Sequence, residues 1–219
     1  MKNTIISVLA LAVVFTACNK DKTITTPADP NAFKVSVSGK IVSVKNLPAD
    51  TIVGLVGGQP VGVGKYAFFN LRTNTWVANT DSASANWDLA FSGSTIRINA
   101  GTSGPGTGGA FVWVGSFDNL ASVPADSVFK TDNYPAYAIT KGSGKGWYSY
   151  DGATNLLNPI PGRVLVIRTG DGKYAKVEIL NYYRGGVTPS ASATDEVKTS
   201  EQRYYTFRYT FQSNGTTTF

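Results

Sequence analysis

Hydrophobic and polar residues alternate with a period of two along several segments of the chain. The alternation is clear in residues 34–37, 41–44 and 95–99, and a short apolar run follows at 111–114. Successive side chains of an extended strand point to opposite faces, so this period is typical of strands with one buried face. The pattern therefore predicts a series of short β-strands joined by turns.

The clearest predicted hairpin covers residues 163–183, where two strands flank an Asp171-Gly172 pair. Asp-Gly favours a tight hairpin turn because both residues tolerate a positive φ. In the second strand the odd-numbered positions from 175 to 179 are apolar and share one face. Lys176 and Glu178 share the other face, and we expect them to form an ion pair there.

The last predicted strand, at residues 204–211, carries an aromatic face made of Tyr205, Phe207, Tyr209 and Phe211. A short helix is expected only near residues 117–120. The polar residues 187–202 are expected to form a long solvated loop. The predicted fold class is therefore all-β: a single sandwich or barrel-like domain, mostly antiparallel, with at most one short helix.

The N-terminal segment has a different pattern, and we expect it to be a signal peptide of residues 1–17. Lys2 supplies a positive charge, an apolar run follows at residues 5–15, and the small residues Thr16 and Ala17 come next. This order is typical of secretory signals. The apolar run is too short to cross about 30 Å of hydrocarbon as a helix, so it is excluded from the predicted fold.

Cys18, the single cysteine of the chain, directly follows these small residues. The segment resembles the bacterial lipobox, which implies that lipid is attached to Cys18. The alternative, a buried free thiol, gives no reason for a cysteine at a cleavage point. We therefore predict a lipid anchor at Cys18, a polar tether over residues 18–32 and a β domain over residues 33–219. The expected location is the outer membrane, on its cell-surface or periplasmic face, with release from the cell as an alternative.

The composition excludes several kinds of chemistry. The chain has no histidine, and its only methionine is Met1, so histidine-dependent nucleophiles and histidine-rich zinc sites are excluded. A glycosidase needs two facing carboxylates; Asp88 and Glu178 can be nominated, but nothing in their spacing singles them out. We expect no enzymatic activity. The net charge of +6 is small and scattered, and we expect no nucleic-acid partner.

A glycine-rich stretch at residues 101–109 contains the spacing Gly104-x-Gly106-x-x-Gly109. This spacing occurs in dinucleotide-binding loops, which require a strand before the loop and a helix after it. Here a second strand is expected after the loop. The stretch is therefore interpreted as a connection with close backbone packing.

Aromatic residues are the most abundant side chains in this sequence that could bind a ligand. Five of them surround the loop of residues 141–146, which includes Lys141 and Lys145: Tyr134, Tyr137, Trp147, Tyr148 and Tyr150. Aromatic side chains beside a basic loop suit a flat, apolar, anionic ligand or the faces of a sugar. The alternative is that Trp147 and one face of its strand belong to the core.

Several segments, taken in their order and spacing, resemble the HmuY haemophore-like lipoproteins of Bacteroidota. The resemblance covers most of the chain from about Tyr66. It rests on Phe68–Asn70, Asn86–Ala90, Ile96–Asn99, the glycine run 101–110, Gly146-Trp147, Arg168, Asp171-Gly172, Ala175–Val177 and Thr206–Thr210. It implies a mostly β domain that takes up haem outside the cell and delivers it to a TonB-dependent outer-membrane receptor.

The chain departs from this family at the iron ligands. In the type member two histidines hold the haem iron, and some relatives are thought to use methionines; this mature chain has neither. One interpretation keeps haem, with a tyrosinate of Tyr150, Tyr137 or Tyr134 on ferric iron and Lys141 or Lys145 beside the propionates. The other interpretation replaces haem with an iron-free porphyrin, a glycan or a partner protein.

Overall fold

The computed structural model describes residue 29 and residues 31–219. The predicted signal peptide, Cys18 and most of the tether lie outside these residues and stay predictions. Within the described part of the chain, no helix is both long and apolar enough to cross a membrane.

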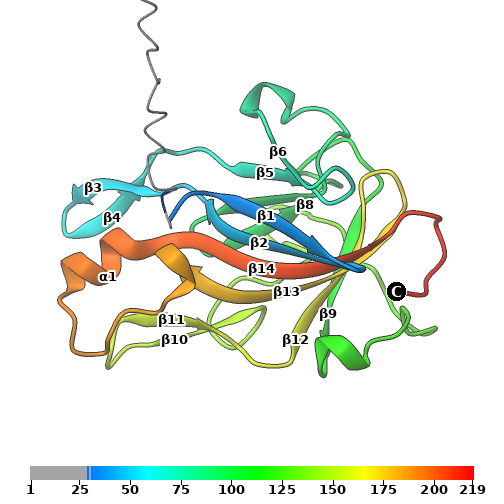
Figure 1. The fold of residues 1–219 in the computed structure, drawn as a ribbon. Helices are drawn as coiled ribbons and strands as arrows, with labels where there is room; N and C mark the ends of the chain where they lie inside the picture. Colours follow the sequence, from blue (N-terminus) through cyan, green and yellow to red (C-terminus); the bar gives the residue numbers. More distant parts are fainter. Residues whose placement is uncertain (1–28, 30) are drawn as a thin grey trace, which may run out of the picture.

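The larger of two main sheets has six strands, and every neighbouring pair in it is antiparallel. In sheet order the strands are β1 (Lys34–Ser38), β2 (Ile41–Pro48), β14 (Gln202–Gln212), β13 (Tyr174–Tyr183), β12 (Arg163–Arg168) and β9 (Gly109–Val114). The long strands β14 and β13 run through the middle of this sheet (Figure 1).

The smaller sheet has four antiparallel strands and packs over one face of the larger one (Figure 1). Its strands, in sheet order, are β6 (Thr75–Val77), β5 (Ala67–Asn70), β7 (Leu89–Ser92) and β8 (Thr95–Ile98). Two separate hairpins are formed by β3 (Ile52–Val56) with β4 (Gln59–Gly62) and by β10 (Tyr148–Asp151) with β11 (Leu156–Pro159). The described sheets do not close into a barrel, so the all-β prediction is confirmed as an open sandwich.

The core lies between the two main sheets and is rich in aromatic rings. Phe69 on β5 and Phe91 on β7 contact Phe207 on β14, with ring centroids 5.5 Å and 5.4 Å apart. All three side chains are fully buried. Burial of each such ring contributes about 1.5–3 kcal/mol, so the predicted aromatic face of the last strand supplies much of the core.

The predicted hairpin of β12 and β13 is confirmed, with Val164 opposite Glu178 and Gly172 at φ +79° in its turn. The ion pair expected between Lys176 and Glu178 is wrong. The Lys176 Nζ atom is buried and donates to two backbone carbonyls of the turn at residues 117–120. That turn covers this face of the strand, and Glu178 pairs instead with Arg208 at 2.7 Å.

The structure contains few helical residues, and only some of them lie where the sequence pattern predicted a helix. The helix expected near residues 117–120 is a single 3-10 turn, Phe117–Asn119; similar turns occur at Asn79–Asp81 and Arg184–Gly186. The expectation of a loop throughout residues 187–202 is wrong, because α1 (Asp195–Glu201) lies within it. The Thr194 hydroxyl caps α1 by accepting from the Val197 N–H, which stabilises a helix N-terminus.

Candidate functional site

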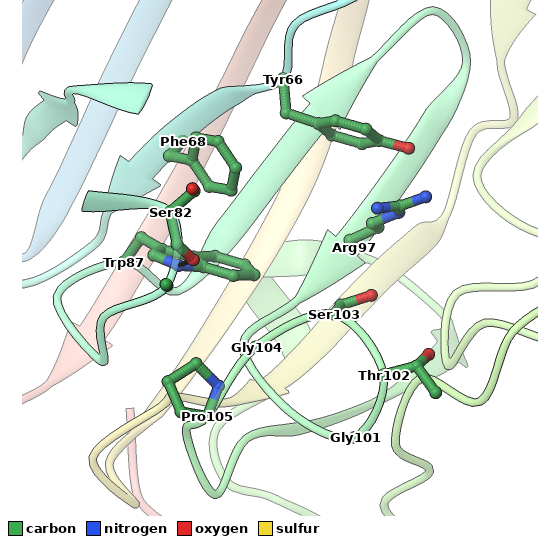
Figure 2. Close-up of a pocket in the computed structure, with 11 residues that line it drawn as sticks. Tyr66, Phe68, Ser82, Trp87, Arg97, Gly101, Thr102, Ser103, Gly104 and Pro105 are labelled. Carbon is green, nitrogen blue, oxygen red and sulfur yellow. Dashed lines mark hydrogen bonds between the residues drawn. The ribbon is translucent and has the colours of Figure 1, made fainter. Parts of the chain in front are cut away.

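A pocket of about 640 Å³ opens at the edge of the smaller sheet. Its main lining side chains come from the start of β5, the loop before β7, strand β8 and the glycine-rich loop: Tyr66, Phe68, Trp87, Arg97, Thr102, Ser103 and Pro105. Figure 2 shows Phe68 and Trp87 on one side of the pocket, Tyr66 and Arg97 on the other, and the glycine-rich loop closing it.

The apolar wall of the pocket is rigidly packed. Phe68 meets Trp87 edge to face, with ring centroids 4.9 Å apart, and both side chains are largely buried. The indole N–H of Trp87 donates to the carbonyl oxygen of Ser82 at 2.9 Å. Trp87 is fully buried and Phe68 is 8% exposed, so Phe68 presents the apolar surface of this wall and the indole, with its one polar atom satisfied, supports it from behind.

The glycine-rich loop is fixed by one buried side chain, that of Asn99. Its Nδ2 atom donates to the carbonyl oxygen of Trp87 at 2.8 Å, and its Oδ1 atom accepts from the Gly106 N–H at 2.9 Å. A Cβ atom at Gly106 would lie 2.6 Å from the Asn99 carbonyl oxygen, so the close approach requires glycine. Strands β8 and β9 flank the loop, which confirms its interpretation as a closely packed connection.

Beside the pocket, two cations alternate with two tyrosine rings in what we call the cation–tyrosine row: Tyr66, Arg97, Tyr137 and Lys141. The Arg97 guanidinium lies 4.2 Å from the Tyr66 ring centroid and 5.1 Å from that of Tyr137. Its Nη2 atom donates to the Tyr137 hydroxyl at 2.9 Å. The Lys141 ammonium lies 5.6 Å from the Tyr137 ring centroid. All three cation–ring distances are within the range of cation–π attraction.

The two tyrosines of the row differ in their environment. Burial raises the pKa of the Tyr66 phenol above its ordinary value of 10.0, and the nearby Arg97 only partly opposes this effect. Tyr66 therefore stays a neutral wall residue. Tyr137 receives a charge-assisted hydrogen bond at its oxygen from Arg97. The Arg97 Nε atom is buried and has no acceptor among the described residues, and the guanidinium forms no ion pair with any of them.

Asp132 positions the row by joining its two halves. One carboxylate oxygen accepts from the Ile98 N–H, next to Arg97, at 3.0 Å, and the other accepts from the Ala138 N–H, next to Tyr137, at 2.9 Å. Burial raises the pKa of this carboxyl above its ordinary 3.8, although both hydrogen bonds favour the charged form. The side chain therefore has a positioning role rather than contact with a ligand.

The residues expected from the sequence to bind a ligand do not lie in one place. Tyr137 and Lys141 belong to the cation–tyrosine row. Tyr134 is 72% exposed, its ring lies 6.4 Å from that of Tyr137, and its backbone N–H donates to the Thr102 hydroxyl of the pocket loop. These three residues form a continuous surface with the pocket.

Trp147 and Tyr148 lie in the core. The Trp147 indole is buried between the rings of Tyr182 and Tyr205, and its N–H donates to the Ser94 carbonyl oxygen at 3.0 Å. The Tyr148 hydroxyl accepts from the Ser94 hydroxyl at 3.3 Å. This packing favours the alternative in which Trp147 is a core residue.

Tyr150 lies beside a different, smaller pocket. Its half-exposed ring lines a space of about 360 Å³ between the β3–β4 turn and α1, and its hydroxyl donates to the Asn155 amide oxygen at 2.7 Å. Lys145 is exposed on the intervening loop, close to Gly142. Within the described part of the chain, neither residue forms a hydrogen bond or a cation–π contact with Arg97 or Tyr137.

The two nominated carboxylates already have partners within the fold. Asp88 is buried and accepts from the backbone N–H groups of Leu71 and Gly170, at 2.8 and 3.2 Å; burial raises the pKa of its carboxyl. Glu178 is held by Arg208. Among the described residues, no group of three or more acidic, histidine or cysteine side chains could hold a metal ion.

The sequence reasoning did not select four residues that define the pocket: Tyr66, Phe68, Trp87 and Arg97. All four stood in segments that carried the family resemblance. A signal for Arg97 was available, because it is a cation between two apolar residues of a short strand. The position of Tyr137 beside it could not be inferred, since it depends on the contacts of Asp132.

Comparison with solved structures found distant similarities. A protein of Bacteroides fragilis described as a lipoprotein has 17% identity and a TM-score of 0.47, covering 81% of this chain and 93% of its own. A protein of Bacteroides vulgatus described as an HmuY-like heme-binding protein has 16% identity and a TM-score of 0.47, covering 81% and 96%. The apo HmuY analog of Tannerella forsythia has 15% identity and a TM-score of 0.41, covering 83% and 97%.

A search of curated proteins found no match. The sequence model of the HmuY protein family, in contrast, matches residues 64–210. The matched region includes every residue of the pocket and of the cation–tyrosine row. Because the match covers well over half of the chain, the chain belongs to the HmuY family.

Proposed function

We propose that this chain is an outer-membrane lipoprotein that binds haem or a related tetrapyrrole for uptake, at the pocket beside Arg97. The lipobox-like segment ending at Cys18 supports the anchor. Family membership supports the ligand class and supports delivery to a TonB-dependent receptor. The alternative is a surface lipoprotein that uses the same scaffold to bind a glycan or another ligand without haem.

One observation carries the choice of ligand class: a pocket with an aromatic wall is lined by one cation, and a second cation lies further along the same row. Phe68, backed by the buried Trp87, provides an apolar wall, Arg97 provides positive charge in the lining, and Lys141 lies beyond the Tyr137 ring. A tetrapyrrole with carboxylate side chains has the complementary distribution, since its ring is apolar and its propionates are anionic. Such a carboxylate would supply the counter-charge that Arg97 lacks among the described residues.

The donor set restricts how haem iron could be held. The chain has no histidine, and Met1 is its only methionine, so the side chains beside the pocket offer oxygen. Tyr137 is the best placed of the three tyrosines named from the sequence, because its oxygen already contacts Arg97. Tyrosinate is an established ligand of ferric haem. Tyr137 would hold the iron, with Lys141 beside the propionates.

A titration tests this proposal. The mature chain, residues 19–219, is titrated with ferric haem while the Soret band is recorded, first for the wild type and then for Tyr137→Phe. We expect a saturable shift in the wild type and a changed band with weaker binding in the variant. Tyr134→Phe and Tyr150→Phe are matched controls, because each removes a partly exposed phenol oxygen that does not contact Arg97.

The outcomes separate the two functions. A Soret spectrum that stays that of free haem at all ratios would contradict haem binding. Metal-free protoporphyrin and a glycan array would then show which other ligand class the scaffold binds. A normal wild-type shift that is lost in Tyr150→Phe and kept in Tyr137→Phe would place the iron ligand at the smaller pocket instead.

A further inference from the structure

The β3–β4 hairpin exposes apolar side chains to an unusual degree. Val53, Leu55 and Val56 are 66%, 57% and 70% exposed, and Val61 and Val63 also face solvent. The two strands form a separate two-stranded sheet that pairs with no other described strand. Single exposed apolar residues are ordinary, but a contiguous apolar group on a projecting element marks an interaction surface.

The tip of this hairpin is built to project. Gly57 and Gly58 form its turn with φ values of +56° and +77°, which suits a tight turn between antiparallel strands. A Cβ atom added at Gly54, Gly57 or Gly58 would have no heavy atom within 4 Å. These three positions therefore face open space, although residues 58–60 line the smaller pocket beside α1, and the exposed valine and leucine side chains belong to no core cluster.

The hairpin lies at the end of the molecule where the described chain begins. Strand β1 starts at Lys34, which pairs with Lys45 near the end of β2. From there β2 leads through residues 49–51 directly into β3. Figure 1 shows the start of β1 and the β3–β4 hairpin on the same side of the domain. Thirteen residues, 19–31, connect this end to Cys18 and reach at most about 45 Å.

The charges at this end favour an anionic partner. Lys34 and Lys45 are exposed and directly opposite each other on neighbouring strands, an arrangement that is unfavourable without a counter-charge. Lys65 is exposed just after β4. Two acids beside the hairpin already have partners: Asp50 at its base pairs with Arg203 at 3.4 Å, and Asp195 of α1, which lines the pocket behind the hairpin turn, pairs with Lys198 at 4.0 Å. Glu196, next to Asp195, is exposed.

From this placement we infer that the β3–β4 hairpin docks on the surface of an anionic phospholipid bilayer. Val53, Leu55 and Val56 insert at the boundary of the acyl chains, and Lys34 and Lys45 face the phosphate groups. The inference rests on the proposed lipid anchor, which would bring this end of the domain to the membrane. It also adds to that anchor, because the hairpin would fix how the domain is oriented on the bilayer.

Vesicle binding by the unacylated protein tests the docking separately from lipidation. The mature chain with Cys18→Ser is sedimented with vesicles of phosphatidylethanolamine and phosphatidylglycerol, and with vesicles of phosphatidylcholine alone. We expect binding to the anionic vesicles, reduced roughly tenfold or more in the triple variant Val53→Ser, Leu55→Ser, Val56→Ser. The pair Lys34→Gln and Lys45→Gln should reduce binding roughly fivefold per lysine on anionic vesicles only.

A matched control removes equally exposed valines elsewhere: Val37→Ser, Val114→Ser and Val128→Ser. This variant should bind vesicles as the wild type does, and circular dichroism of each variant shows that the fold is kept. Equal vesicle binding by the hairpin variant and the wild type, or no binding by the wild type, overturns the inference. So does a wild-type dimer in sedimentation that the hairpin variant loses, because the hairpin then contacts a second copy. Failure of Cys18 to incorporate labelled palmitate would refute the anchor alone.

Discussion

Two arginine–tyrosine pairs in this domain have nearly the same local chemistry but different surroundings. Arg97 donates to the Tyr137 hydroxyl at 2.9 Å, and its guanidinium lies 4.2 Å from the Tyr66 ring centroid. Arg184 donates to the Tyr204 hydroxyl at 2.6 Å and lies 4.3 Å from the ring centroid of the same tyrosine. Both pairs are partly buried.

The difference is in the counter-charge. The Nε atoms of both arginines are buried without a hydrogen-bond acceptor among the described residues. The Arg184 Nε atom, however, lies 3.5 Å from the Glu201 carboxylate, so this guanidinium has a counter-charge, and the pair joins the end of β13 to α1. Arg97 has no ion pair within the described part of the chain, and it lines the pocket. An arginine–tyrosine contact therefore marks a ligand site only where the guanidinium lacks a counter-charge and lies beside a cavity.

The largest effect on stability and binding is expected from replacing Asp132, whose carboxylate holds the segments of Arg97 and Tyr137 in place. Asp132→Asn should lower the free energy of unfolding by about 1–3 kcal/mol, because a backbone N–H loses its acceptor, and should weaken ligand binding. Asp88→Asn likewise removes one of two backbone contacts, away from the row, and should cost similar stability and leave binding unchanged. Urea unfolding and haem titration measure both. Equal loss of binding in the two variants would contradict a positioning role for Asp132.

Titration of Asp88 and Asp132 should make the free energy of unfolding depend on pH. Burial raises the native pKa of Asp88 and Asp132 above the ordinary 3.8, so the native state binds these protons more tightly than the unfolded state. Their contribution to the free energy of unfolding is then full below pH 3.8, falls as the pH rises through the native pKa, and is level above it. The stability difference between the wild type and Asp132→Asn should shrink over that range. A difference that grows with pH would contradict the direction of the shift.

A smaller effect on stability is expected from removing the hydroxyl group of Tyr137 or of Tyr204. Tyr204→Phe should lower the free energy of unfolding by roughly 1 kcal/mol without changing haem affinity. Tyr137→Phe should have a comparable effect on stability and a marked effect on the Soret band of the haem complex. If Tyr204→Phe altered haem binding as strongly as Tyr137→Phe, the distinction between the two pairs would fail.

The smallest effect on stability is expected from neutralising Glu201, the counter-charge of Arg184. Glu201→Gln removes a half-exposed ion pair, so it should cost about 0.2–1 kcal/mol at low salt and less at high salt. Thermal unfolding at two salt concentrations measures this. A loss that does not depend on salt would show that Glu201 acts by packing rather than by charge.

The strands with one apolar face could be predicted from the sequence because their period follows directly from which side is buried. β14 places Tyr205, Phe207 and Tyr209 in the core, as the alternation requires. The expectation failed where another element covers the second face, as the 117–120 turn does over Lys176. It failed again at α1, which is too short and polar to show a helical period, although Thr194 and the acidic first turn are an N-terminal signal.

The site could be predicted only in part. Tyr137 and Lys141 were found because aromatic and basic residues cluster in that segment of the sequence. Their partners Tyr66 and Arg97 come from distant segments, and the pairing of β5, β7 and β8 brings these together. Trp147 shows the opposite error, since an aromatic residue beside a basic loop can belong wholly to the core.

The most direct test of the account compares Arg97→Gln with Arg184→Gln in ferric haem binding. Each variant removes a guanidinium that hydrogen-bonds a tyrosine, so the local loss is matched. The account predicts that Arg97→Gln raises the haem Kd about tenfold or more, as expected for a charge-assisted hydrogen bond of about 1.5–3 kcal/mol, while Arg184→Gln leaves the Kd unchanged. An unchanged Kd in a correctly folded Arg97→Gln protein would contradict the assignment of this pocket as the ligand site.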